Sequence, residues 1–438
     1  MKKTWICSLL TLCMLSVTPG TAALAAAPDQ DHTPAAETTS GSLPDAGPQD
    51  QPVSAEEPEG TDISETETTE TPVYIPDLTI ETAKKSSKSI QISWVSPDDY
   101  FVSKYYLMRR SVKNSIGKGN WKTLAVLAAK GLKEGASYSC TDSLKSSEPQ
   151  QYEYKICTLS ADQKTDTRDA AYESQTNETA VLGSNIKICI DPGHYGTLNN
   201  NYELTGADGN YPYSEAVFNL EVAKSLQTEL KQFYGIDSFL TRTGESVSLK
   251  YNGKTYKNEN LDQKNIAVRG YAAKQQGCDF FVSLHTNSTS RPSKPWSQPK
   301  SINKAYVFVN QIAHASDRGM LIANTIGKSL TSYNKQAGIQ TSGFITRSKN
   351  KAAAFSNLNN DSAKTNGTVV HRRSSSGGDY YGVLRGASAD GTPGILIEHA
   401  FHATQIVRKR AGISSELSES WAECDAYGIA VGFGFLES

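Results

Sequence analysis

The sequence lacks a cysteine framework. Seven cysteines occur in 438 residues, and no Cys-x-x-Cys pair is present. This spacing excludes both a dense set of disulfides and a zinc site built from thiolates. We expect the cysteines beyond residue 27 to be small buried residues, with a Cys140–Cys157 bridge left open; they are Cys140, Cys157, Cys189, Cys278 and Cys424.

Long apolar runs are also scarce. The only one begins after Lys2 and Lys3, spans Trp5–Val17 and leads to the small residues Ala23–Ala25. A charged start, an apolar run and an Ala-x-Ala site are typical of a cleaved secretory signal, and the run falls short of the ~20 apolar residues of a membrane span. We therefore predict a signal peptide over residues 1–27. The mature protein is expected to be secreted, extracellular or associated with the cell wall, without stable membrane insertion.

Positive charge is missing from one long segment. Ala26–Ile75 contains 12 Asp or Glu and no Lys or Arg, with few large apolar residues. Such a segment cannot bury enough surface to offset its chain entropy, so we predict a disordered acidic linker over residues 28–75. Without this segment and the signal, 42 Lys or Arg face 34 Asp or Glu. A cationic folded part suits an anionic surface such as a cell wall. Export and the absence of nucleic-acid motifs argue against a nucleic-acid partner.

Residues 76–182 contain short β-rich runs separated by polar turns. Several runs alternate apolar and polar residues, as half-buried strands do, and their spacing over about 100 residues predicts an all-β sandwich domain. The expected strands are Ser89–Val95, Lys104–Arg109, Trp121–Leu127, Tyr138–Cys140 and Tyr152–Leu159.

The β-rich segment resembles a fibronectin type III domain. The resemblance rests on Trp94 in an early strand, on Tyr138–Leu144 (YSCTDSL), and on Tyr152–Tyr154 (YEY), which is similar to that family's tyrosine corner. No reactive cluster of residues occurs here. A spacer module and a module that binds the wall or a partner both stay open.

From residue 186 onward, strand and helix patterns alternate. This alternation predicts an α/β catalytic domain over residues 186–438, with a mostly parallel or mixed sheet flanked by helices. The expected strands are Lys187–Ile190, Asp237–Leu240, Phe280–Leu284, Ala305–Val309 and Gly394–Ile397. The expected helices are Ser214–Phe233, Lys264–Gln275, Asp317–Tyr333 and Trp421–Phe435.

Metal-binding and acid–base side chains follow three of these strands. His194 lies four residues after its strand, whereas His285 and Glu398 directly follow theirs. Glu215 lies in the first turn of the helix after the His194 loop. Because sites in such sheets gather at the carboxyl ends of the strands, we expect these side chains to converge.

Two imidazoles and one carboxylate form a three-ligand zinc site that leaves one position open for water. A further carboxylate can act as general base and then protonate a leaving amine. His194 and Glu215 are 21 residues apart, so the site cannot be a local His-Glu-x-x-His motif. The residues alone leave structural roles open for each of these side chains.

The catalytic half resembles the zinc-dependent N-acetylmuramoyl-L-alanine amidases known as amidase 3. The resemblance implies that His194, Glu215 and His285 are zinc ligands, that Glu398 is the catalytic glutamate, and that Arg385 contacts substrate. The matching stretches occur in family order: Lys187–Gly196 (KICIDPGHYG), Ser214–Ala223 (SEAVFNLEVA), Leu240–Gly244 (LTRTG), Phe281–Asn287 (FVSLHTN), Val383–Arg385 (VLR) and Pro393–Phe401 (PGILIEHAF).

The same resemblance implies the reaction. We expect zinc-activated water to hydrolyse the amide between N-acetylmuramic acid and L-alanine in peptidoglycan, in a monomeric enzyme with Zn²⁺ as its cofactor. One alternative is a zinc peptidase that cuts bonds within the stem peptide. Another is a non-catalytic cell-wall-binding protein, against which the presence of all the site residues argues.

Other residues of the catalytic half have open roles. Arg242 and Arg269 match family positions and are expected to be structural. His399 and His402 flank Glu398 unusually; they tune its pKa, contact substrate, or belong to the core or surface. Two long inserts occur, at Ser246–Leu261 and at about Gly343–Asp379. The second is polar and basic, and it is either a lid or glycan-contacting loop or a variable surface loop.

Overall fold

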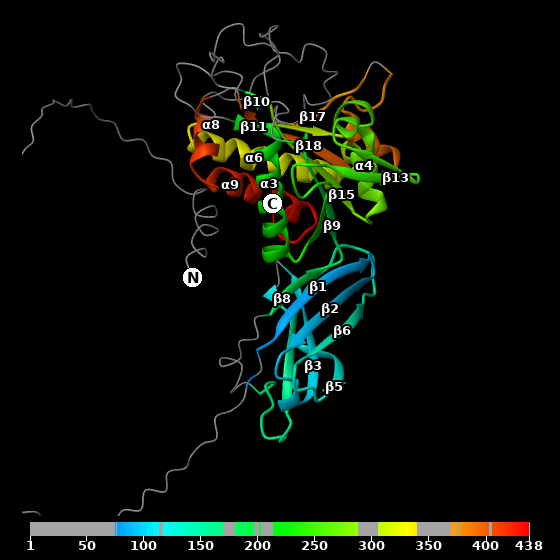
Figure 1. Ribbon diagram of the computed structural model, residues 1–438, viewed down its shortest axis with the longest axis vertical. Coiled ribbons are helices and arrows are strands. Elements are labelled where there is room, and N and C mark those ends of the chain that lie inside the picture. The colour runs from blue at the N-terminus through cyan, green and yellow to red at the C-terminus, as the bar shows by residue number, and fades with distance from the viewer. Residues whose placement is uncertain are drawn as a thin grey trace, which may run out of the picture. The chain divides into compact units, whose positions relative to one another are not determined.

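The computed structural model describes residues 75, 77–113, 117–169, 180–196, 201–202, 213–287, 305–339, 369–374, 376–402 and 405–437 (Figure 1). All of these described residues fall within one compact unit. The predicted signal peptide and, apart from Ile75, the predicted acidic linker lie outside the described residues, as does most of the second insert.

The β-rich segment forms two antiparallel sheets. One has three strands in the order β1-β2-β6; the other has the order β4-β3-β7-β8, with β5 also pairing with β3. The strands are β1 (Thr79–Ser86), β2 (Ser89–Ser96), β3 (Val102–Lys113), β4 (Gly117–Lys118), β5 (Lys122–Ala128), β6 (Ala136–Ser143), β7 (Gln151–Ser160) and β8 (Val181–Ser184). A short 3-10 helix, η1 (Asp99–Phe101), precedes β3.

Side chains from both sheets form one hydrophobic core. In β2 the buried residues Ile90, Ile92 and Trp94 alternate with more exposed ones, as expected for a strand with one buried face. Trp94 stacks on Tyr138 with ring centroids 5.2 Å apart. The finer resemblance to a fibronectin type III domain stays a prediction.

The catalytic half contains a six-stranded mixed sheet in the order β12-β9-β15-β18-β16-β17. The pair β16–β18 is antiparallel and the other pairs are parallel, which agrees with the predicted mixed sheet. Its strands are β9 (Lys187–Pro192), β12 (Asp237–Leu240), β15 (Phe280–Asn287), β16 (Tyr306–Val309), β17 (Val369–His371) and β18 (Gly394–Phe401). Two short hairpins lie beside it: β10 (Asn201–Tyr202) with β11 (Tyr213–Ser214), and β13 (Ser248–Tyr251) with β14 (Lys254–Lys257).

Helices cover both faces of this sheet (Figure 1). Residues of α3, α6 and α9 share one core with alternate residues of β9 and β15, while α4 and α7 pack on the other face. The helices are α3 (Glu215–Tyr234), α4 (Ala267–Gln275), α5 (Gln311–His314), α6 (Asp317–Gln336), α7 (Gly382–Ala389), α8 (Gln405–Ile413) and α9 (Glu416–Gly432), with a π-helical turn, η2 (Asn260–Lys264), before α4. Among the described helices, none combines the length and apolarity needed to cross a bilayer.

Three strands of this sheet, β9, β15 and β18, extend further than the sequence predicted, so that His194 follows β9 by two residues rather than four. His285 and Glu398 lie inside β15 and β18 rather than directly after them. The reason is that the parallel ladder pairs His285 with Glu398 and continues, after a register shift, to Asn287 and Phe401. Both side chains still lie near the carboxyl ends of their strands.

The five cysteines beyond residue 27 are all free thiols, so the Cys140–Cys157 bridge that the sequence left open is not formed. Cys157, Cys189 and Cys278 are buried, as expected for small core residues, whereas Cys140 and Cys424 are only half-buried. Burial also raises the pKa of the Cys189 thiol well above its ordinary value.

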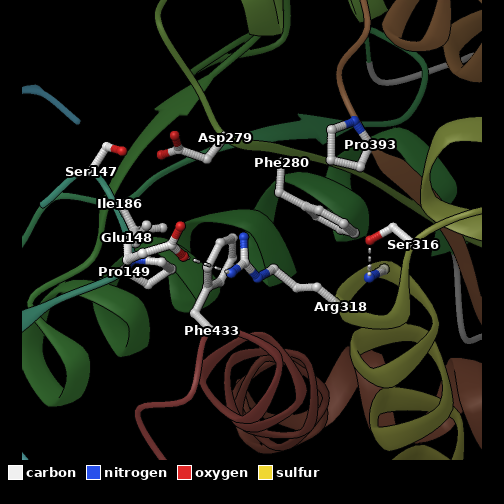
Figure 2. A pocket seen from close by; sticks show the side chains of 11 residues that line it. Ser147, Glu148, Pro149, Ile186, Asp279, Phe280, Ser316, Arg318, Pro393 and Phe433 are labelled. Carbon is white, nitrogen blue, oxygen red and sulfur yellow. Dashed lines mark hydrogen bonds and ion pairs between the residues drawn. The ribbon is translucent and has the colours of Figure 1, made fainter.

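A cavity of about 250 Å³ opens at the amino ends of the sheet strands (Figure 2). Ile186, Phe280 and Pro393, which precede or begin β9, β15 and β18, line it. Arg318 faces Glu148 across the cavity at 3.9 Å. The cavity therefore lies at the edge of the sheet opposite the side chains expected to carry chemistry.

Candidate metal centre and catalytic carboxylate

His194 lies in a tightly held loop after β9. Its backbone φ is 60°, a left-handed conformation that residues with a side chain seldom adopt. Arg242 donates to the carbonyl oxygens of Pro192 and Gly193, both at 3.0 Å, and Arg269 donates to that of His194 at 2.5 Å. Both arginines are buried, as expected for structural residues.

Arg269 is itself held by Asp191. The two side chains form an ion pair at 2.9 Å and are 1% and 0% exposed. Asp191 also accepts hydrogen bonds from Thr241 Oγ1 at 2.5 Å and Ser283 Oγ at 2.8 Å. Burial alone raises the pKa of Asp191, but Arg269 and these hydroxyls outweigh burial and lower it. The His194 loop therefore rests on a buried ion pair.

Gly193 allows the loop to pass close to His285. A Cβ atom at this position would lie 2.2 Å from Cε1 of His285, well inside van der Waals contact. The glycine is needed here for close approach, because any side chain would displace the imidazole.

Glu215 begins α3, directly after its N-cap Ser214. Its Oε1 atom lies 3.1 Å from Nδ1 of His285 and 3.4 Å from Nε2 of His194. The same oxygen accepts a hydrogen bond from the backbone N–H of Thr286 at 3.1 Å. The helix start thus places a buried carboxylate between two imidazoles.

The structure brings the three predicted ligands together. One ligand atom from each of His194, Glu215 and His285 lies within 4.8 Å of the others. The imidazole planes are inclined at 86° with centroids 4.9 Å apart. A donor set of two imidazoles and one carboxylate from separate elements fits a zinc ion.

Asp262, in η2, was not predicted from the sequence. Its carboxylate oxygens lie 3.3 Å from Nδ1 of His194. An acceptor at Nδ1 would fix the tautomer in which Nε2 of His194 is the metal-binding nitrogen, as second ligand shells commonly do. Asp262 follows an insert without a recognisable motif, so no sequence signal distinguished it.

The charges of the site act strongly on one another. Burial alone lowers the pKa of His194, but Glu215 and Asp262 outweigh it and raise the pKa to about 10. Burial alone raises the pKa of Glu215, but His194 and His285 hold it well below its ordinary value. Glu215 is therefore an anion that attracts positive charge, which a bound divalent cation would supply equally well.

Glu398 lies beside this triad, paired in register with His285 on the next strand. Burial and the charge of Glu215 raise the pKa of Glu398 well above its ordinary value. Its Oε2 atom is buried and has no hydrogen-bond partner among the described residues. Two neighbouring carboxyl groups with pKa values shifted in opposite directions are typical of acid–base chemistry.

The remaining candidate residues are not part of the His–Glu–His cluster. His399 and His402 are buried rather than exposed, and each bonds to a backbone carbonyl oxygen of β15. Arg385 is exposed on α7, and its guanidinium donates to the carbonyl oxygens of Asp379 and Tyr380 at 3.0 and 2.5 Å. No described contact joins Arg385 to the triad or to Glu398, so its substrate role stays a prediction.

An α/β fold with a buried His–Glu–His cluster and an adjacent carboxyl group defines a candidate metal-dependent hydrolytic site. Residues 188–430, more than half of the chain, match the N-acetylmuramoyl-L-alanine amidase family Amidase_3. The chain belongs to this family.

The match to an individual curated relative covers a smaller part of the chain than the match to the family. The chain is 36% identical over 105 residues to the sporulation-specific N-acetylmuramoyl-L-alanine amidase of Bacillus subtilis (strain 168), a match that covers 24% of this chain and 32% of the relative. It thus spans about a third of the length of that curated relative.

Solved structures are similar at low identity. Cwp6 from Clostridium difficile matches at 20% identity and a TM-score of 0.36, over 56% of this chain and 28% of that chain. The catalytic domain of CwlV, an N-acetylmuramoyl-L-alanine amidase from Bacillus (Paenibacillus) polymyxa var. colistinus, matches at 17% identity and a TM-score of 0.33, over 56% of this chain and 96% of that chain.

Proposed function

We propose that the protein is a zinc-dependent N-acetylmuramoyl-L-alanine amidase that hydrolyses the amide between N-acetylmuramic acid and L-alanine in peptidoglycan. One observation carries the proposal: the His194–Glu215–His285 cluster and the adjacent Glu398 fall together inside the segment that matches the amidase family. Membership of the family supports the bond type, and the donor set supports the metal.

His194, Glu215 and His285 are the residues that would hold zinc. When bound, zinc lowers the pKa of a coordinated water to about 7 and stabilises the negative charge that develops on the substrate carbonyl oxygen. With zinc bound, Asp262 would accept a hydrogen bond from Nδ1 of His194, so that Nε2 would be the nitrogen offered to the metal. The buried Asp191–Arg269 pair holds the loop that presents the imidazole.

Glu398 moves the proton in this proposal. The oxygen of the attacking water bonds to the carbonyl carbon, and a carboxylate oxygen of Glu398 accepts the proton that the water loses. When the carbon–nitrogen bond breaks, Glu398 returns the proton to the alanine nitrogen, so that a carboxylate and a free amine result. Burial raises the pKa of Glu398, which favours the protonated form that delivers the proton to the leaving nitrogen.

The rest of the chain is assigned by the same proposal. Residues 1–27 act as a secretory signal, residues 28–75 as an acidic linker, residues 76–182 as a fibronectin type III-like module, and residues 186–438 as the amidase domain. The mature protein works as a monomer outside the cell or at the cell wall, where peptidoglycan is its partner. Arg385 contacts the substrate from α7.

Metal removal and return test the proposal. The purified mature protein is dialysed against a chelator, and clearing of a suspension of purified cell walls is followed by turbidity. We expect clearing to stop on chelation and to return when one equivalent of Zn²⁺ is added. Undiminished clearing by the zinc-free protein would exclude the metal mechanism, and binding to walls without clearing by the zinc-loaded protein would favour a non-catalytic role.

A further inference from the structure

The pairing between β15 and β18 is interrupted beside the candidate site. His285 pairs with Glu398, but two residues later Asn287 pairs with Phe401, three residues further along. The extra residue in β18 is a β-bulge, which breaks the backbone ladder locally. The carbonyl groups at the break must find other donors, because buried backbone groups are nearly always paired.

Two imidazoles supply these donors. Nδ1 of His399 lies 3.1 Å from the carbonyl oxygen of His285, and Nδ1 of His402 lies 3.0 Å from that of Thr286. A carbonyl oxygen only accepts hydrogen bonds, so each Nδ1 carries the proton. Side chains therefore take over the role of the ladder next to a candidate metal ligand.

His399 is held from several sides. Its Nε2 atom lies 2.9 Å from Oδ2 of Asp425, and its ring stacks on Trp421 with centroids 4.8 Å apart. Asn334 donates to the carbonyl oxygen of His399 at 2.9 Å and accepts from Nε1 of Trp421 at 3.0 Å. All four side chains are almost completely buried. Residues of α6 and α9 thus fix the orientation of the imidazole.

The bond from His399 reaches Glu215 through one peptide group. The carbonyl oxygen of His285 accepts from His399, and the N–H of the same peptide, on Thr286, donates to Oε1 of Glu215 at 3.1 Å. Hydrogen bonds in such a chain polarise and align one another. This peptide therefore links the backbone of one candidate ligand to the carboxylate of another.

We infer that His399, oriented by Asp425, is a positioning residue that fixes the peptide between His285 and Thr286 and thereby sets the mutual geometry of the metal ligands His285 and Glu215. The inference rests on the proposed function in that it takes these two residues as metal ligands. It does not depend on which amide bond the enzyme cuts.

Three substitutions of His399 distinguish its positioning role from a contribution to core packing alone. His399→Asn keeps an N–H donor near the position of Nδ1, His399→Gln keeps one only near Nε2, and His399→Phe keeps the ring and its stacking without either nitrogen. We measure the zinc dissociation constant of each full-length mature variant by competition with a chromophoric chelator. The visible spectrum of the Co²⁺-substituted protein reports the ligand geometry.

The expected order is specific. His399→Phe and His399→Gln bind zinc roughly 10- to 100-fold more weakly than wild type, as is typical when an outer-shell partner is lost. His399→Asn stays near wild type and keeps the Co²⁺ spectrum. In the two weakened variants, measured with saturating zinc, kcat falls while KM for cell walls changes little.

A second buried histidine supplies the matched control. His371 is also buried, and its Nε2 atom lies 3.3 Å from Oδ1 of Asp379. It lies on β17, the edge strand of the sheet, which β16 separates from β18. His371→Phe should lower the urea midpoint of unfolding to a similar extent as His399→Phe without weakening zinc binding. Equal losses of zinc affinity in both would point to general destabilisation and overturn the inference.

Other outcomes also decide the matter. Wild-type zinc affinity in His399→Phe, no advantage of His399→Asn over His399→Phe, or a wild-type protein that binds no zinc would each overturn the inference. A wild-type protein that binds zinc but releases no amidase product would refute the proposed function alone, since the order of zinc affinities is measured without substrate.

Discussion

Replacing Glu398 by glutamine removes the proposed proton carrier while keeping the shape of the side chain. Glu398 lies in register with the candidate metal ligand His285, and its Oε2 atom has no partner among the described residues. The amide can neither accept the proton of the attacking water nor deliver it to the leaving nitrogen. General acid–base catalysis contributes roughly 10²- to 10⁴-fold to enzymatic rates, which corresponds to about 3–5 kcal/mol of transition-state stabilisation.

The structure also predicts what this substitution leaves intact. The three candidate ligands are untouched, so zinc binding should persist. Because the pKa of Glu398 is raised in the folded protein, the folded state binds more protons than the unfolded state above pH 4.5. In the zinc-free protein this carboxyl group makes stability fall as pH rises from that value toward the raised pKa. Glu398→Gln should therefore be at least as stable as wild type at pH 7, and the difference should vanish at acidic pH.

The assay combines release of soluble muropeptides from purified walls, zinc content and urea unfolding of both proteins. Glu221→Gln on the exposed side of α3 makes the same chemical change away from the site and should keep wild-type activity. A Glu398→Gln protein that binds zinc and retains most of its activity would refute the base assignment. Loss of zinc together with activity would instead make Glu398 part of the metal site.

Three further substitutions test the parts of the site separately. Asp262→Ala should weaken zinc binding roughly 10- to 100-fold in a chelator competition, and an unchanged affinity would remove Asp262 from the site. Gly193→Ala should lower the zinc content below one ion per chain, because its Cβ atom would lie 2.2 Å from Cε1 of His285; full occupancy would show that the loop moves freely. Asp191→Asn should cost about 3–5 kcal/mol in urea unfolding, since it leaves Arg269 buried and unpaired. The lowered pKa of Asp191 also means that wild type loses stability as pH falls below about 3.8, a loss that the variant should show less strongly.

Much of the catalytic half could be predicted from sequence periodicity. The helix predicted over Ser214–Phe233 is α3 (Glu215–Tyr234), and the strand predicted over Asp237–Leu240 is β12 with the same bounds. In each of these segments, apolar residues recur with the spacing of a helix or of a strand, so the local sequence is enough to predict the element. The convergence of His194, Glu215 and His285 was also predicted, because the carboxyl ends of parallel strands meet at one edge.

Other features depend on tertiary contacts that leave little trace in the sequence. Asp262 reaches His194 from a π-helical turn that follows the hairpin of the first insert, and neither element has a simple sequence pattern. The burial of His399 reflects partners on α6 and α9 that are distant in sequence. The bulge in β18 depends on register with a neighbouring strand, which periodicity within one strand does not encode.

The most direct measurement of the central claim is mass spectrometry of the products that the zinc-loaded protein releases from purified peptidoglycan. Hydrolysis of the amide between N-acetylmuramic acid and L-alanine predicts intact stem peptides with a new amino-terminal L-alanine, and glycan strands that keep unsubstituted lactyl groups. Shortened stems still attached to muramic acid would contradict the account and identify a peptidase. The Glu398→Gln protein, analysed alongside, should release neither product.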